Sequence, residues 1–246
     1  MNSKELISRA KETIHTFTKE TSCFPKPKLE KLSGFFDHTF LSPSAGASDI
    51  KRLCEEAKKY GFCSVCVNPY WVSIARGELQ KTDVGVTTVV GFPLGANSPK
   101  VKCEEAKVAI WEGADEIDMV QNIGLIKSGE FEAVSDEIKL IKETIGGNTL
   151  KLIIETAYLT DIEKVISCLL AKEAGADFVK TSTGFAKTGA TIYDVALMRH
   201  TVGERVGVKA AGGIRTLADA IAMIQAGATR LGASSSVKII EETKTF

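Results

Sequence analysis

The sequence lacks any long hydrophobic run. Nowhere do its 246 residues approach the ~18 consecutive apolar residues that a membrane-spanning helix requires. The first 20 residues contain no apolar signal core, and they carry Glu5, Glu12 and Glu20, which a transit peptide would avoid. We therefore expect a cytoplasmic protein without a membrane partner.

An excess of charge of either sign is also missing. Lys and Arg together number 31, as do Asp and Glu, so the formal net charge at pH 7 is zero. A nucleic-acid-binding surface needs a positive excess to neutralise phosphates. The balance argues against a nucleic-acid partner, although a small local phosphate site is compatible with it.

Histidine is scarce, and the cysteines form no convincing ligand set. A chain of this length buries a large core and does not need a disulfide framework. Cys63 and Cys66 have C-x-x-C spacing, but they lie in a strand-like run, where residues three apart point to opposite faces. We expect buried free thiols and no metal site. The cysteines are Cys23, Cys54, Cys63, Cys66, Cys103 and Cys168.

Two nucleotide-binding motifs are absent. The pattern G-x-x-x-x-G-K-[ST] does not occur, which argues against a P-loop NTPase. The first apolar run is followed by Leu41–Gly46, which does not match the G-x-G-x-x-G pattern of dinucleotide-binding folds.

What the sequence does contain is a regular alternation of short apolar runs and helical stretches. The centres of consecutive runs lie 23 to 36 residues apart, and Thr160-x-x-Glu163 is a capping box at one helix start. This rhythm predicts parallel strands with right-handed crossovers, and eight units suit a (β/α)₈ barrel. An open doubly wound sheet is the alternative. The runs are Phe35–Thr39, Ser64–Asn68, Val84–Phe92, Glu116–Val120, Leu152–Glu155, Phe178–Thr181, Val206–Ala211 and Arg230–Ala233.

The N-terminus stands outside this alternation. Residues 3–20 place Leu6, Ala10 and Ile14 on one face of a predicted helix, and a proline-containing linker follows at residues 24–28. We interpret 1–34 as an extension packed on the main domain and 35–246 as the barrel.

Three charged residues lie within otherwise apolar strands: Asp118, Lys180 and Lys209. A barrel strand is buried on both faces, and a charge buried there costs several kcal/mol unless it is paired. If all three point inward, they meet near the C-terminal mouth, where barrel active sites lie. The simpler alternative is one buried Lys–Asp pair with the second lysine pointing outward.

Two neighbouring buried lysines have a chemical consequence. Their mutual repulsion and their desolvation both favour a neutral amine, so one pKa should fall well below ~10.4. A neutral amine is a nucleophile toward carbonyl carbons. The pattern therefore predicts Schiff-base formation.

A phosphate site is predicted after the last two strands. Glycines let backbone N–H groups approach an anion, serines add donors, and barrels often hold phosphate in these loops. Turn glycines and a capping serine are the simpler explanation. The candidates are Gly212 and Gly213 after strand 7, Gly232 near the end of strand 8, and Ser234 and Ser235 after strand 8.

The first strand ends with Asp37, His38 and Thr39. Asp37 and Thr39 are candidates to orient water or substrate hydroxyls. His38 could act as a base, but a single histidine without a nearby nucleophile is more often a packed residue.

With these residues identified, the chain resembles the deoxyribose-phosphate aldolase family from about Phe36 to Lys238. The resemblance implies a class I aldolase on a (β/α)₈ barrel, which cleaves 2-deoxy-D-ribose 5-phosphate reversibly into D-glyceraldehyde 3-phosphate and acetaldehyde without a cofactor. The motifs that carry it are Asp37–Thr39, Cys66–Pro69, Gly91–Gly95, Gly113–Val120, Lys180–Gly184 and Lys209–Arg215.

The resemblance also implies roles for individual residues. Lys180 would form the Schiff base, and Lys209 would depress its pKa and share proton transfer with Asp118. Gly212, Gly213, Ser234 and Ser235 match phosphate-holding positions, and Thr183 and Asp37 would add hydrogen bonds to the lining. A homodimer or homotetramer is expected from the family, acting in deoxyribose phosphate catabolism.

Two other functions remain open from the residues. Another Schiff-base sugar-phosphate lyase, such as a transaldolase-like barrel, would share the lysine but retain a different fragment. A non-catalytic sugar-phosphate-binding relative should have lost one of the three charged residues, and all three are present. A metal-dependent aldolase is disfavoured by the scattered histidines.

Overall fold

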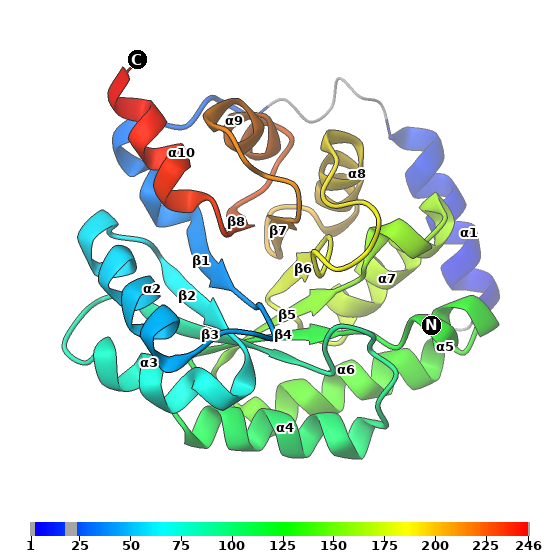
Figure 1. The fold of residues 1–246 in the computed structure, drawn as a ribbon. Helices are drawn as coiled ribbons and strands as arrows, with labels where there is room; N and C mark the ends of the chain where they lie inside the picture. The colour runs from blue at the N-terminus through cyan, green and yellow to red at the C-terminus, as the bar shows by residue number, and fades with distance from the viewer. Residues whose placement is uncertain (1–2, 18–23, 246) are drawn as a thin grey trace.

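A computed structural model describes residues 3–17 and 24–245 and shows eight parallel strands closed into a barrel (Figure 1). Each strand pairs with the next in chain order, and β8 pairs with β1. The predicted (β/α)₈ barrel is confirmed. The strands are β1 Phe36–Phe40, β2 Ser64–Val67, β3 Gly85–Val90, β4 Glu116–Val120, β5 Thr149–Ile153, β6 Phe178–Lys180, β7 Gly207–Ala211 and β8 Arg230–Ala233.

Helices alternate with the strands and form the outer layer of the barrel (Figure 1). The predicted capping box is present, because Thr160 and Glu163 exchange hydrogen bonds at the start of α7. The helices are α1 Ser3–Thr16, α2 Ala47–Tyr60, α3 Val72–Glu78, α4 Pro99–Trp111, α5 Ile123–Ser128, α6 Phe131–Ile145, α7 Asp161–Glu173, α8 Ile192–Val202, α9 Leu217–Gln225 and α10 Ser236–Glu242. The 3₁₀ helices are η2 Leu29–Phe35, η3 Pro69–Trp71, η4 Thr156–Tyr158 and η5 Thr243–Thr245.

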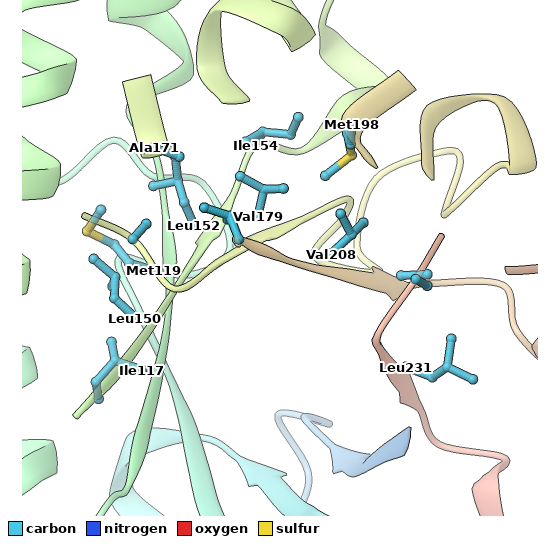
Figure 2. Packing of buried hydrophobic residues seen from close by; sticks show 14 of the residues in the cluster. Ile117, Met119, Leu150, Leu152, Ile154, Ala171, Val179, Met198, Val208 and Leu231 are labelled. Atoms are coloured by element: carbon cyan, nitrogen blue, oxygen red, sulfur yellow. The ribbon is translucent and has the colours of Figure 1, made fainter. Parts of the chain in front are cut away.

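The main core lies between the strands and the helices. Side chains of alternate strand residues form it, including Ile117, Leu150, Val179 and Val208, all fully buried (Figure 2). The residues between them on each strand therefore point into the barrel, because successive side chains alternate between faces. Asp118, Lys151, Lys180 and Lys209 occupy such inward positions.

β4 and β8 have the predicted bounds, β1, β2, β6 and β7 differ by one residue at one or both ends, and β3 and β5 differ by more. The third run was expected to continue to Phe92, but β3 ends at Val90, because Gly91 turns the chain with a positive φ of 61°. The fifth was expected at Leu152–Glu155, whereas β5 begins at Thr149 and includes Lys151. Because β5 begins three residues earlier than predicted, it includes Lys151, whose side chain points into the barrel.

The N-terminal helix packs on the outside of the barrel beside α7 (Figure 1). Leu6 and Ala10 are buried, and Arg9 pairs with Glu173 of α7 at 2.9 Å. The helix ends at Thr16 rather than continuing to residue 20, and residues 18–20 lie outside the described part of the chain.

The described cysteines are free, and Cys54, Cys66, Cys103 and Cys168 are buried as expected, whereas Cys63 is only half-buried. Cys23 lies outside the described residues. In the parts of the chain that the structure covers, no helix has the length and apolar character needed to cross a membrane.

Candidate active site

A cavity of about 390 Å³ lies at the carboxyl ends of β1, β6, β7 and β8. Lys180 contributes to its wall, as does Thr39 at the end of β1. Six further residues predicted to contact substrate or phosphate also line it, namely Thr183, Gly212, Gly213, Gly232, Ser234 and Ser235. The fold thus brings residues from the first strand and from the last third of the sequence to one opening.

Beneath this cavity, one carboxylate joins the two predicted lysines. Lys180 and Lys209 lie opposite each other in the pairing of β6 with β7. The Nζ atom of each lies 2.7 Å from the same oxygen, Oδ2 of Asp118. Both lysines therefore point inward, which contradicts the alternative of one paired and one outward-facing lysine.

A third lysine, Lys151 on β5, was not identified from the sequence. Its Nζ lies 2.8 Å from Oδ1 of Asp118, the oxygen that the other two lysines leave free, and 2.5 Å from Oε2 of Glu116. The pairing of β4 with β5 places Asp118 beside Lys151. Both oxygens of Asp118 are thus held by buried amines, which fixes the orientation of the carboxylate.

Asp37 belongs to this buried cluster and does not line the cavity. Its carboxylate pairs with Lys209, accepts a hydrogen bond from Ser64 at 2.8 Å, and lies 2.6 Å from Arg230 Nη1. Arg230 also pairs with Glu116 at 3.0 Å. The predicted direct contact of Asp37 with substrate is therefore not supported by its position, which instead holds Lys209.

The surroundings give the lysines different proton affinities. Burial lowers the pKa of Lys180, and Lys209 lowers it further, against the opposing effect of Asp118. Burial acts in the same direction on Lys209, but Asp118 and Asp37 outweigh it and raise its pKa. At Asp118, burial favours the neutral acid, yet the three lysines hold its pKa well below the usual range. Lys180 is therefore the amine of this pair that loses its proton more readily.

Two glycines, Gly213 after β7 and Gly232 within β8, leave space for different groups. Gly213 has a φ of 82°, and a Cβ there would have no atom within 4 Å, so its backbone is open to the cavity. At Gly232 a Cβ would come 3.1 Å from Cε of Lys209. Gly232 thus makes room for the second lysine as well as lining the cavity.

His38 and Cys66 lie away from the cavity wall. The His38 ring contacts Ser236 Oγ at 2.5 Å and Glu56 Oε2 at 2.8 Å, and it is buried. Cys66 is fully buried in a small apolar cluster with Leu41 and Val89, and this burial raises its pKa. Neither is placed to act on a substrate in the cavity.

Acidic, histidine and cysteine side chains in residues 3–17 and 24–245 form no group of three or more that could hold a metal ion.

Comparison with known proteins agrees with this geometry. The family model described as "DeoC/LacD family aldolase" matches residues 34–241. The chain belongs to the DeoC/LacD aldolase family. It is an enzyme, a carbon–carbon lyase, as the names of its relatives indicate.

Close relatives cover most of the chain. Deoxyribose-phosphate aldolase of Caldanaerobacter subterraneus is 55% identical over 219 residues, which cover 88% of this chain and 95% of the relative. That of Streptococcus gordonii is 56% identical over 211 residues, which cover 86% of this chain and 96% of the relative.

Solved structures agree in fold. One from Coccidioides immitis matches with a TM-score of 0.94 and 42% identity, covering 99% of this chain and 98% of its own. Another, titled as a unique tetrameric deoxyribose phosphate aldolase from Aeropyrum pernix, has a TM-score of 0.81 and 31% identity. It covers 100% of this chain and 99% of its own.

Proposed function

We propose that this aldolase cleaves 2-deoxy-D-ribose 5-phosphate through a Schiff base on Lys180. The position of Lys180 carries the proposal. It lines the cavity, it lies 2.7 Å from a shared carboxylate oxygen, and its pKa is lowered by burial and by Lys209. A neutral amine at the base of a cavity can attack the aldehyde carbon of a bound sugar.

The cleavage follows from this attack. Lys180 adds to C1 of the open-chain sugar, and the carbinolamine loses water to give an imine. The protonated imine accepts the electron pair of the C2–C3 bond when the C3 hydroxyl loses its proton. Glyceraldehyde 3-phosphate leaves, and an enamine remains on Lys180. Protonation of this enamine at C2 and hydrolysis release acetaldehyde.

Asp118 and Lys209 are the groups that support proton movement. Asp118 Oδ2 contacts both amines, and its low pKa keeps it ionised, so it stabilises the iminium that forms on Lys180. Lys209 stays protonated because Asp118 and Asp37 raise its pKa, so it can donate a proton through a bridging water.

The phosphate group of the substrate would lie at the wall formed by the segments that follow β7 and β8. Gly212 and Gly213 offer backbone N–H groups there, and Ser234 and Ser235 offer hydroxyls. Arg215 also lines this region and adds a positive charge, although the sequence analysis did not select it.

Borohydride trapping tests the proposed nucleophile. The folded protein is incubated with acetaldehyde or with the sugar phosphate, reduced, digested and mapped by mass. We expect an ethyl adduct on Lys180 from acetaldehyde, and no adduct at this position in Lys180→Ala. An unmodified Lys180 in folded, active protein would refute the assignment.

We also infer that the chain forms a homo-oligomer. The outer face of α4 exposes Val108 and Trp111, the latter 85% exposed, and Val108 lines a groove together with Tyr70. Such an apolar face is typical of a subunit interface. Trp111→Glu should lower the mass measured in solution if a second copy covers it, and an unchanged mass would place the interface elsewhere.

Location in the cytoplasm remains a prediction from the sequence.

A further inference from the structure

The mechanism leaves unused one buried acid close to the site, Glu155. It follows β5, is 2% exposed, and adopts a left-handed backbone conformation with φ of 43° and ψ of 74°. A residue other than glycine is rarely found in this conformation, and such outliers persist where surrounding contacts over-determine them. The contacts of the Glu155 side chain supply a reason for it.

Glu155 binds the loop that follows Lys180. Its Oε2 accepts the Thr183 hydroxyl at 2.5 Å and the Thr183 backbone N–H at 3.1 Å. The Thr183 hydroxyl oxygen in turn accepts the backbone N–H of Phe185 at 3.1 Å. One carboxylate thus holds the loop directly at Thr183 and, through the Thr183 hydroxyl, at Phe185.

The residues held in this way form one wall of the cavity. Thr183, Gly184 and Phe185 line it, whereas Glu155 does not. The Phe185 ring packs edge-on against Phe92 from the loop after β3, with 5.3 Å between ring centroids. The wall therefore extends from the position beside Lys180 to the outer rim.

Lys180 itself is held by other contacts. Its carbonyl accepts the N–H of Ile154 at 3.0 Å, and its amine is bound by Asp118. Loss of the Glu155 side chain would therefore release the wall while leaving the nucleophile in place.

We propose that Glu155 is a positioning residue, which orders the 183–185 loop so that the sugar phosphate is aligned with Lys180. This rests on the proposed function, because Lys180 is taken as the nucleophile. The two-carbon aldehyde, which needs little alignment, should depend much less on Glu155 than the five-carbon sugar phosphate does.

The test compares Glu155→Ala and Glu155→Gln with Glu163→Ala. Glu163 is a matched control, because it also accepts the N–H and the hydroxyl of one threonine, Thr160, at 2.7 and 2.9 Å. It caps α7 and does not line the cavity. The readouts are amide hydrogen exchange, kcat and KM for the sugar phosphate, and the rate of borohydride trapping with acetaldehyde.

For Glu155→Ala we expect the Thr183 and Phe185 amides to exchange at least about 10-fold faster than in the unmodified protein. We expect kcat/KM for the sugar phosphate to fall by about 30- to 100-fold, and acetaldehyde trapping to change by less than about 3-fold. Glu155→Gln keeps an acceptor oxygen and should restore kcat/KM to within about 3-fold. Glu163→Ala should leave both amides protected and both reactions unchanged.

The proposal is overturned if these two amides keep their protection, if both reactions fall together, or if Glu155→Gln is as impaired as Glu155→Ala. Should Glu155→Ala fail to fold, Thr183→Val provides the same readout. It removes the hydroxyl but keeps the N–H, so the Phe185 amide alone should lose protection, and an unchanged Phe185 amide would overturn the proposal. Absence of trapping in the unmodified protein would instead refute the role of Lys180, and the exchange result would still stand.

Discussion

Replacing Lys209 by methionine tests the idea that a neighbouring cation activates Lys180. Both amines lie 2.7 Å from one oxygen of Asp118, so their nitrogen atoms are at most twice that distance apart. At an effective dielectric constant of ~20, two unit charges at this separation repel by about 3 kcal/mol. That energy corresponds to roughly a 100-fold change in the neutral fraction of Lys180 on the acid side of its titration.

Lys209→Met should therefore suppress imine formation at low pH. Removal of the second cation also leaves Asp118 more strongly paired with Lys180, which acts in the same direction. We expect the acid limb of the pH profile for acetaldehyde trapping to move to higher pH. On that limb the trapping rate should fall by about 100-fold. At high pH, where Lys180 is neutral in both proteins, the two rates should converge.

Trapping is the appropriate assay because it reports imine formation separately from later proton transfers. A matched Lys209→Arg variant keeps the positive charge and should keep the acid limb in place if it folds. Equal trapping rates in Lys209→Met and the unmodified protein across the acid range would refute electrostatic activation by Lys209. Thermal unfolding of each variant shows that the comparison is made between folded proteins.

Further predictions concern the buried charges and the glycine beside them. Asp37→Asn removes a buried carboxylate that pairs with three cations, Lys151, Lys209 and Arg230, and should cost about 3–5 kcal/mol in urea unfolding. The folded pKa of Asp37 is depressed, so its contribution is full above ~pH 4, the unfolded value, and is lost as pH falls toward the folded pKa; the Asn variant should lack this dependence. In the buried pair of Lys102 and Glu137, 2.9 Å apart, either single apolar replacement should cost about 3–5 kcal/mol. The double apolar replacement should recover most of the lost stability, because no buried charge is then left unpaired. Losses that add in the double variant would contradict this expectation. Gly232→Ala should press on Lys209 and lower kcat by about 10-fold with little change in unfolding temperature, whereas an unchanged kcat would show that the lysine can move aside.

The principal charged residues of the barrel were predictable because charged side chains are not expected within apolar strands. Asp118, Lys180 and Lys209 interrupt apolar runs, and such an interruption needs a buried partner. The bounds of β4 and β8 agree with the predicted runs because polar residues border both runs on each side.

Lys151 was missed because its strand begins with polar residues. Thr149 and Lys151 alternate with Leu150 and Leu152, which is the two-residue period of a strand with one face on the main core. By composition alone this segment resembles a solvated helix end. Only the pairing of β5 with β4 shows that Lys151 faces Asp118, and strand register is a tertiary property that the local sequence does not contain.

The buried cluster holds one more basic group than acidic groups, and the number of carboxylate contacts indicates which amine becomes the nucleophile. The basic groups are Lys151, Lys180, Lys209 and Arg230, and the acidic groups are Asp37, Glu116 and Asp118. Lys151 pairs with all three carboxylates, Lys209 with two and, within the described residues, Lys180 with one. Each contact stabilises an ammonium form, so Lys180 loses its proton before the other two. Lys180 is also the lysine that lines the cavity. The proposed reactive amine is therefore the lysine with the fewest carboxylate partners, and it lies at the cavity that the substrate would enter.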